Sequence, residues 1–100
     1  MAYVTRLEKV RSDIADLAIV REQVETQIGA LAEVQLKLRA QQAKAAEMGR
    51  PDLAELAAGR VRLADEQMSE LTARQGALRE QIRKLAETAG RLEARVPKRR

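Results

Sequence analysis

The chain has 100 residues, of which none is Cys, His, Trp or Phe and only one is Tyr. This composition excludes disulfides, thiol nucleophiles, imidazole bases and zinc sites built from Cys or His. With 45% hydrophobic residues, 34% charged residues and a net charge of +4, the chain has the composition of long helices or coiled coils rather than of a disordered protein.

The first predicted element is a long helix over about residues 2–48, because apolar residues recur there at steps of three and four. This spacing repeats every seven residues and forms the contact stripe of a coiled coil, which we call the seam. The seam of this helix alternates between two sets of positions, which are Tyr3, Val10, Leu17, Val24, Leu31, Leu38 and Ala45, and Leu7, Ile14, Arg21, Ile28, Gln35 and Gln42.

A turn is predicted at residues 49–51, where the chain has its strongest helix-breaking signal. Gly49 suits the end of the first helix, and Pro51 suits the first turn of the next one. Asp52 adds a carboxylate near the second N-terminus, where the helix dipole favours negative charge. Together with Arg50, these residues form the predicted connection between two helices.

The second predicted helix covers about residues 52–96 and has a more regular seam. Its seam residues are Ala54, Ala57, Val61, Ala64, Met68, Leu71, Gln75, Leu78, Ile82, Leu85, Ala89, Leu92 and Val96. If the chain folds back at the turn, seam residues whose numbers sum to 99 face one another, so that Leu7 meets Leu92 and Leu31 meets Met68. This register predicts an all-α fold in which two long helices form an antiparallel coiled-coil hairpin, a single domain over residues 1–96.

Polar residues and glycines also have defined places in this register. Gln35 and Gln42 face Ala64 and Ala57, and we expect these small partners to leave room for the amides to reach water. Four glycines take outward positions, which are Gly29, Gly59, Gly76 and Gly90. They either allow the close approach of neighbouring chains or reflect drift at exposed sites.

Pro97 closes the second helix and begins a basic tail, residues 97–100. Residues 1–94 contain 15 basic and 15 acidic side chains, so the excess charge comes from Arg95, Lys98, Arg99 and Arg100. One interpretation is an anion-binding tail for a membrane surface or a nucleic-acid backbone. The other is a solubilising terminus whose cations suit the negative end of a helix.

Five apolar residues lie off the seam, in the half of the hairpin that contains the turn. They are Val34, Leu36, Leu53, Leu56 and Leu63. Leu36 and Leu63 fall at the same height, because their numbers also sum to 99. Exposed leucines can be scattered without consequence, but a cluster of them indicates an interface, so we predict a surface for self-association or for a helical protein partner.

No phosphate-binding loop, metal-ligand spacing or pair of nucleophile and base occurs in the sequence. We therefore expect a non-enzymatic protein with no catalytic residues, no metal, no cofactor and no small-molecule substrate. The alternative function is a nucleic-acid-binding arm that uses the tail and the arginines of the second helix, which are Arg60, Arg62, Arg74, Arg79, Arg83 and Arg91. Against this alternative, residues 1–94 are neutral and provide no aromatic platform for bases.

The N-terminal segment has no apolar core of signal-peptide length, and the longest aliphatic run, residues 17–20, is far too short to span a membrane. We therefore expect a cytoplasmic protein, with peripheral contact at the inner face of an anionic membrane as a further option.

A segment near the turn, Gly49-Arg50-Pro51-Asp52-Leu53-Ala54, together with the Ala-rich residues 42–48 before it, resembles the phage-shock protein A (PspA) family. This family includes the thylakoid vesicle-inducing proteins. The region around Arg21, Gln23 and Val24 and the phrases between Leu78 and Leu85 are similar in character. The resemblance covers the coiled-coil hairpin core.

The resemblance implies a scaffold of the membrane-remodelling class related to ESCRT-III. Such proteins polymerise through their helical hairpins at stressed bacterial or thylakoid membranes, and some of them restrain a stress-response transcription activator. We expect a departure from the family pattern, in which an amphipathic helix precedes the hairpin and further helices follow it, because the 100 residues match the hairpin core alone. We therefore expect a regulator, a modifier of assembly or a core fragment rather than an autonomous remodelling protein.

Overall fold

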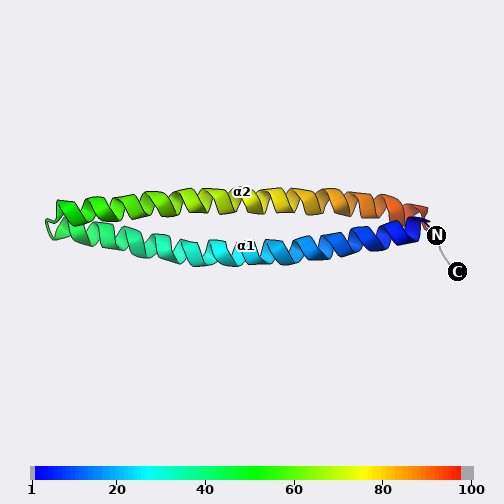
Figure 1. The fold of residues 1–100 in the computed structure, drawn as a ribbon, viewed down its shortest axis with the longest axis horizontal. Helices are drawn as coiled ribbons and strands as arrows, with labels where there is room; N and C mark the ends of the chain where they lie inside the picture. The colour runs from blue at the N-terminus through cyan, green and yellow to red at the C-terminus, as the bar shows by residue number, and fades with distance from the viewer. Residues whose placement is uncertain (1, 98–100) are drawn as a thin grey trace. The chain divides into compact units, whose positions relative to one another are not determined.

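The computed structural model describes residues 2–97 and contains two helices, α1 (Ala2–Glu47) and α2 (Pro51–Arg95), joined by a short turn (Figure 1). The protein is all-α, and its two long helices form an antiparallel coiled-coil hairpin. α1 ends one residue earlier than predicted from the sequence, and α2 begins and ends one residue earlier. Lys98, Arg99 and Arg100 of the predicted tail lie outside the described residues.

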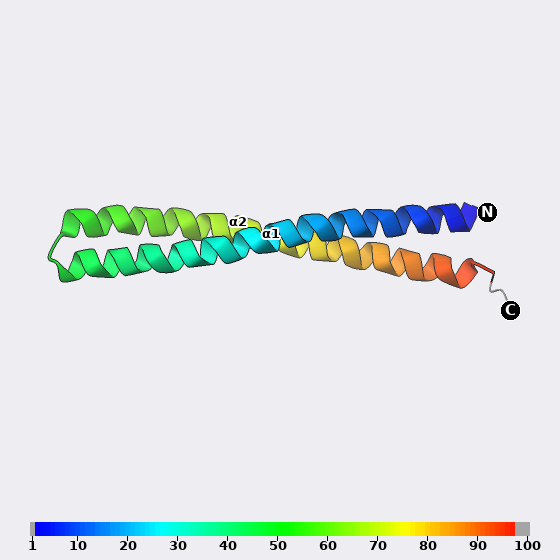
Figure 2. The same cartoon turned by 90° about the horizontal axis from the view of Figure 1, so that it is seen from below.

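The contacts of the chain divide it into two compact units. We call residues 24–74 the turn unit, and residues 1–23 with residues 75–100 the terminal unit. Within each unit, a segment of α1 lies beside a segment of α2 in both views (Figures 1 and 2). The turn unit contains seven basic and eight acidic residues, a net charge of −1, so the terminal unit carries +5.

The terminal unit is built on large aliphatic side chains. Leu7, Ala89 and Leu92 form a buried cluster, against which Val10 and Ile14 pack. All five are seam residues, and the predicted register places Leu7 opposite Leu92 and Val10 opposite Ala89, which explains why the two helices pair in this register. Among the described residues, every seam position except one is buried or half-buried.

The exception is Tyr3, which the heptad pattern places on the seam but which is 37% exposed. The guanidinium carbon of Arg95 lies 5.7 Å from the centroid of the Tyr3 ring, so a cation covers one face of the ring. Tyr3 therefore lies at the margin of the seam, where its hydroxyl can reach water while its ring packs against an arginine.

The turn unit buries smaller side chains than the terminal unit does. Its buried residues are Val24, Ala45, Ala57 and Ala64, and Val24 is 1% exposed. The large seam residues of this unit, such as Leu38, are only half-buried. Because the energy of burial scales with the apolar area removed from water, an alanine-rich seam contributes less per layer than a leucine-rich one.

Polar contacts also join the two helices in the turn unit. The amide of Gln35 donates to Oδ1 of Asp65 at 2.8 Å, and Nη2 of Arg39 donates to the same oxygen at 3.0 Å. Gln35 was expected beside Ala64 with its amide in water, but the neighbouring carboxylate accepts the amide proton instead. Asp65 therefore connects one seam residue and one flanking residue of α1 to α2.

The turn closes α1 with a Schellman motif. Gly49 has a φ of 66°, in the left-handed region that glycine adopts without strain. Its amide donates to the carbonyl of Ala46 at 3.1 Å, and the amide of Arg50 donates to the carbonyl of Ala45 at 3.0 Å. Pro51 then occupies the first helical position of α2, where a missing amide proton has no cost to the helix.

Candidate interaction surfaces

All five apolar residues that lie off the predicted seam are exposed to solvent. Their exposed fractions range from 41% at Leu53 to 69% at Leu36. All five belong to the turn unit. The structure gathers some of them and separates others, so they do not form one continuous cluster.

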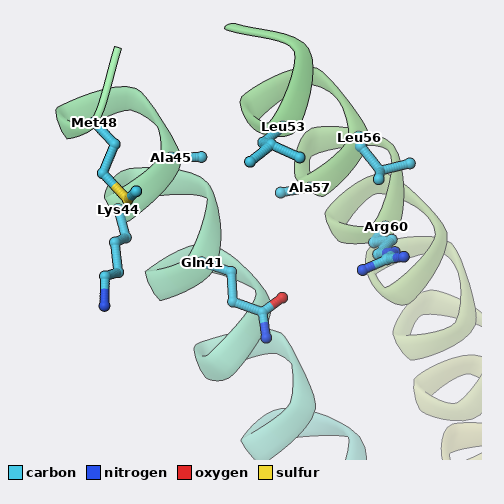
Figure 3. Close-up of a pocket in the computed structure, with 8 residues that line it drawn as sticks. All are labelled: Gln41, Lys44, Ala45, Met48, Leu53, Leu56, Ala57 and Arg60. Carbon is cyan, nitrogen blue, oxygen red and sulfur yellow. The ribbon is translucent and has the colours of Figure 1, made fainter. Parts of the chain in front are cut away.

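Leu53 and Leu56 line a hollow of about 250 Å³ beside the turn, which we call the turn groove (Figure 3). Ala45 of α1 and Ala57 of α2 point towards each other between the two helices and form its floor (Figure 3). The turn groove is lined by Gln41, Lys44 and Ala45 from α1, by Met48 from the turn, and by Leu53, Leu56, Ala57 and Arg60 from α2. Its small floor residues explain the hollow, because two alanines leave space that leucines would fill.

Met48 is a residue of the turn groove that the sequence interpretation missed. Its side chain is 62% exposed, although it lies next to the apolar residues of the turn. Met48 follows Gln41 by seven residues, so both side chains project from the same side of the chain end, and this spacing was the available signal. A flexible thioether at the edge of an apolar hollow suits contact with surfaces of varied shape.

Leu36 and Leu63 lie on different sides of the turn unit, although they fall at the same height. Leu36 is three residues before Arg39, which pairs across the helices with Asp65. Leu63 is three residues after Arg60, which lines the turn groove. The turn unit therefore has one side closed by polar contacts and another side, the groove side, with exposed apolar groups.

Val34 belongs to the groove side as well, because it lies seven residues before Gln41 on α1. It is 44% exposed and does not line the turn groove itself. The predicted surface is therefore better described as Val34, Met48, Leu53, Leu56 and Leu63 on the groove side, with Leu36 separate from it.

The polar residues of the turn interact with one another rather than with the groove. Nε and Nη2 of Arg50 donate to the two carboxylate oxygens of Asp52, each at 3.3 Å. Hydrogen bonding from the Arg50 side chain, together with a hydrogen bond from the Leu53 backbone amide, lowers the pKa of Asp52. The pair lies where α2 begins, so it helps to position the connection between the two helices.

Two of the α2 arginines in the nucleic-acid alternative are paired with carboxylates on their own helix. Nη2 of Arg62 lies 3.8 Å from Oε1 of Glu55, and Arg83 pairs with both Glu80 and Glu87. The hydrogen bond from Arg83 lowers the pKa of Glu80. These pairs reduce the positive charge that this part of α2 presents to a phosphate backbone.

Within residues 2–97, no three acidic side chains gather closely enough to hold a metal ion. The described helices also include none that combines the length and the apolar character needed to cross a membrane.

Comparison of the chain with protein-family models, with curated proteins and with solved structures found no match. The resemblance to the PspA family therefore stays a prediction from the residues around the turn.

Proposed function

We propose that this chain is a non-enzymatic coiled-coil interaction module that associates with a second copy of itself through the groove side of the turn unit. The partner side chains would fill the turn groove and cover the exposed leucines beside it. This arrangement would make the hairpin a building block of a scaffold.

The observation that supports this proposal is the position of the large apolar side chains. In the described part of the chain, six of the eight exposed large apolar residues lie in the turn unit, while that unit buries mainly alanines. Burying a leucine is worth about 1.5–3 kcal/mol. An association that covers Leu53, Leu56 and Met48 would therefore gain burial that the hairpin alone does not provide.

The charge of the turn unit supports a second copy as the partner. With a net charge of −1, two turn units repel each other little, and proteins near neutrality associate readily. The turn groove also has both cationic and apolar parts, since Lys44 and Arg60 lie at its edge. A two-fold contact would place each unit's leucines in the groove of the other, which is the usual geometry of a homodimer.

The biological setting rests on the resemblance to the PspA family. It supports a role in membrane stress response or in membrane remodelling, on the cytoplasmic side of an anionic membrane. Within that setting, the hairpin would act as a scaffold component or as a modifier of its assembly.

The test is the molar mass of the full chain, measured by light scattering across a wide range of concentration. We expect the 11.1 kDa chain to shift towards twice this mass or more as its concentration rises. The double variant Leu53→Glu, Leu56→Glu should stay monomeric over the same range, because each new carboxylate would have to be buried in the contact.

Ile19→Glu is the matched control, because Ile19 is 57% exposed and lies in the terminal unit. The Ile19→Glu chain should assemble to the same molar mass as the wild-type chain at each concentration. A wild-type chain that is monomeric at every concentration would contradict the proposal, and so would a double variant that assembles like the wild type.

The alternative function, nucleic-acid binding through the tail and α2, has less support because Arg62 and Arg83 are paired. It predicts binding to a DNA or RNA duplex that falls steeply with salt concentration. The same light-scattering variants would not affect that binding, so the two functions can be separated.

A further inference from the structure

The terminal unit contains a hollow of about 140 Å³ that is lined mainly by arginines. Its lining residues are Arg6 from α1 and Thr88, Arg91, Leu92 and Arg95 from α2. We call it the arginine hollow. No carboxylate lines it, and all three guanidinium groups belong to exposed residues above the buried side chain of Leu92.

Two of the three guanidinium groups are held in place by uncharged partners. Nη2 of Arg91 donates to the hydroxyl of Thr88 at 3.1 Å, and Arg95 lies over the ring of Tyr3. These contacts restrict the side chains without neutralising them, and such preorganisation lowers the entropic cost of binding a ligand. Within residues 2–97, no ion pair joins Arg6, Arg91 or Arg95 to a carboxylate.

The same unit shows that a cross-helix arginine can be neutralised where a carboxylate is available. Nη2 of Arg11 lies 2.8 Å from Oε1 of Glu93, which joins α1 to α2 by an ion pair. Arg91 and Arg95, by contrast, are like charges one helical turn apart, and such pairs destabilise a helix. The arginine hollow is therefore a concentration of positive charge that an anion would relieve.

The chemistry of the hollow points to a phosphate group. A guanidinium presents a planar fork of donors that fits two oxygens of a phosphate, and three such forks match a dianion. The hollow is larger than the about 10–15 Å³ needed for one water, so a tetrahedral anion has room to enter. The described residues of the terminal unit, 2–23 and 75–97, carry nine basic and seven acidic side chains, and this net charge of +2 also attracts anions.

We propose that Arg6, Arg91 and Arg95 form a binding site for a phosphate dianion, which is either the monoester headgroup of a lipid or free inorganic phosphate. Thr88 contributes by orienting Arg91, and Tyr3 contributes by orienting Arg95. The site lies on the hairpin itself and is separate from the turn groove, so it does not depend on self-association.

The first experiment titrates inorganic phosphate into the full chain near pH 7.5 and follows the backbone amide signals of Thr88 and Arg91 by NMR. We expect saturable binding that weakens by at least about tenfold in the triple variant Arg6→Gln, Arg91→Gln, Arg95→Gln. The control Arg11→Gln should change the affinity by less than about twofold, because Arg11 is already paired with Glu93. Circular dichroism verifies that each variant keeps its helices.

The second experiment distinguishes the two sources of phosphate. It compares vesicles that contain phosphatidic acid, a monoester, with vesicles that contain phosphatidylglycerol, a diester, at matched surface charge. Stronger binding to phosphatidic acid that the triple variant loses supports a lipid headgroup. Saturable binding of inorganic phosphate without a preference between the vesicles supports a free phosphate.

Three results would overturn the proposal. In the first, the triple variant binds phosphate and both vesicles as tightly as the wild type. In the second, Arg11→Gln weakens phosphate binding as much as the triple variant does, which would indicate general attraction instead of a site. In the third, the wild-type chain shows neither saturable binding of inorganic phosphate nor stronger binding to phosphatidic acid than to phosphatidylglycerol.

Discussion

The two units of the hairpin use large apolar side chains in opposite ways. In the terminal unit, Leu7 and Leu92 lie in the buried seam, and few large apolar residues are exposed. In the turn unit, Ala57 and Ala64 occupy the buried seam, while leucines such as Leu56 face solvent. The comparison shows that a heptad pattern can form one fold with two different surfaces. The terminal unit buries its leucines in its own seam, whereas the turn unit leaves several of them exposed to solvent.

The flanks of the two units differ in chemistry as well. The turn groove is lined by leucines and a methionine around a floor of alanines, whereas the arginine hollow carries three guanidinium groups. Both hollows lie beside a seam, so the seam residues determine the fold and the flanking residues determine the surface that each unit presents. The following predictions test this division, from the largest expected effect to the smallest.

The largest effect is expected from shortening a seam leucine in the terminal unit. Leu92→Ala should lower the free energy of unfolding by about 2–4 kcal/mol, because Leu92 is buried in the Leu7 cluster and its removal leaves a cavity. Ile19→Ala, at an exposed site of the same unit, should change it by less than about 0.5 kcal/mol. Urea unfolding at one fixed protein concentration measures both, and equal losses would contradict the assignment of Leu92 to the core.

Alanine substitutions at two glycines should change the free energy of unfolding in opposite directions. Gly76→Ala in the terminal unit should raise the free energy of unfolding by about 1 kcal/mol, because its added Cβ meets no atom within 4 Å and alanine is the better helix former. Gly49→Ala in the turn unit should lower it by about 1–2 kcal/mol, because its φ of 66° strains any other residue. Thermal unfolding would show the two shifts, and a stabilising Gly49→Ala would refute the Schellman turn.

The coupling free energies of the cross-helix ion pairs should differ between the two units, by less than the stability changes predicted above. A double-mutant cycle of Arg39→Gln and Asp65→Asn should give a coupling of about 0.2–1 kcal/mol, which is typical of half-exposed pairs. The cycle of Arg11→Gln and Glu93→Gln should give less, because Gln35 also donates to Asp65 and holds it in position. Both couplings should shrink in about 1 M salt. Coupling that is larger at Arg11 than at Arg39 would be inconsistent with this role of Gln35.

The smallest effect concerns pH. The hydrogen bond from Arg50 lowers the pKa of Asp52 in the folded chain below its unfolded value of about 3.9. The contribution of Asp52 to stability is therefore complete above about pH 4 and is lost as the pH falls through the folded pKa. The stability difference between the wild type and Asp52→Asn should narrow on acidification, as should that for Glu80→Gln in the terminal unit. A difference that widens in acid would contradict the sign of these shifts.

Much of the fold could be predicted from the sequence, because both helices follow one heptad pattern and the turn has strong local signals. Gly49 and Pro51 indicate where α1 ends and where α2 begins to within a residue. The predicted register also places Leu7 opposite Leu92, and both residues lie in the buried cluster. Tyr3 occupies a seam position of the heptad pattern but is 37% exposed, and Arg95 lies over its ring.

The surfaces were harder to predict, because they depend on which flanking residues of two helices meet. Leu36 and Leu63 lie at the same level along the hairpin, which suggested a shared surface. That level does not specify towards which side of its helix each residue projects. Met48 was missed because it lies in the turn just after α1, where a residue becomes part of a groove only once α2 folds back. Counting charge along the chain indicated Arg95 and the tail, whereas the convergence of Arg6 with Arg91 requires the paired helices.

Cross-linking at a single position would test the proposed self-association most directly. The chain has no cysteine, so Leu56→Cys introduces one reactive thiol in the turn groove, and Ile19→Cys introduces one at an exposed site of the terminal unit. Under mild oxidation, we predict a disulfide-linked dimer of Leu56→Cys that forms faster than that of Ile19→Cys and that the added change Leu53→Glu suppresses. Equal rates for the two single variants would contradict association through the groove side of the turn unit.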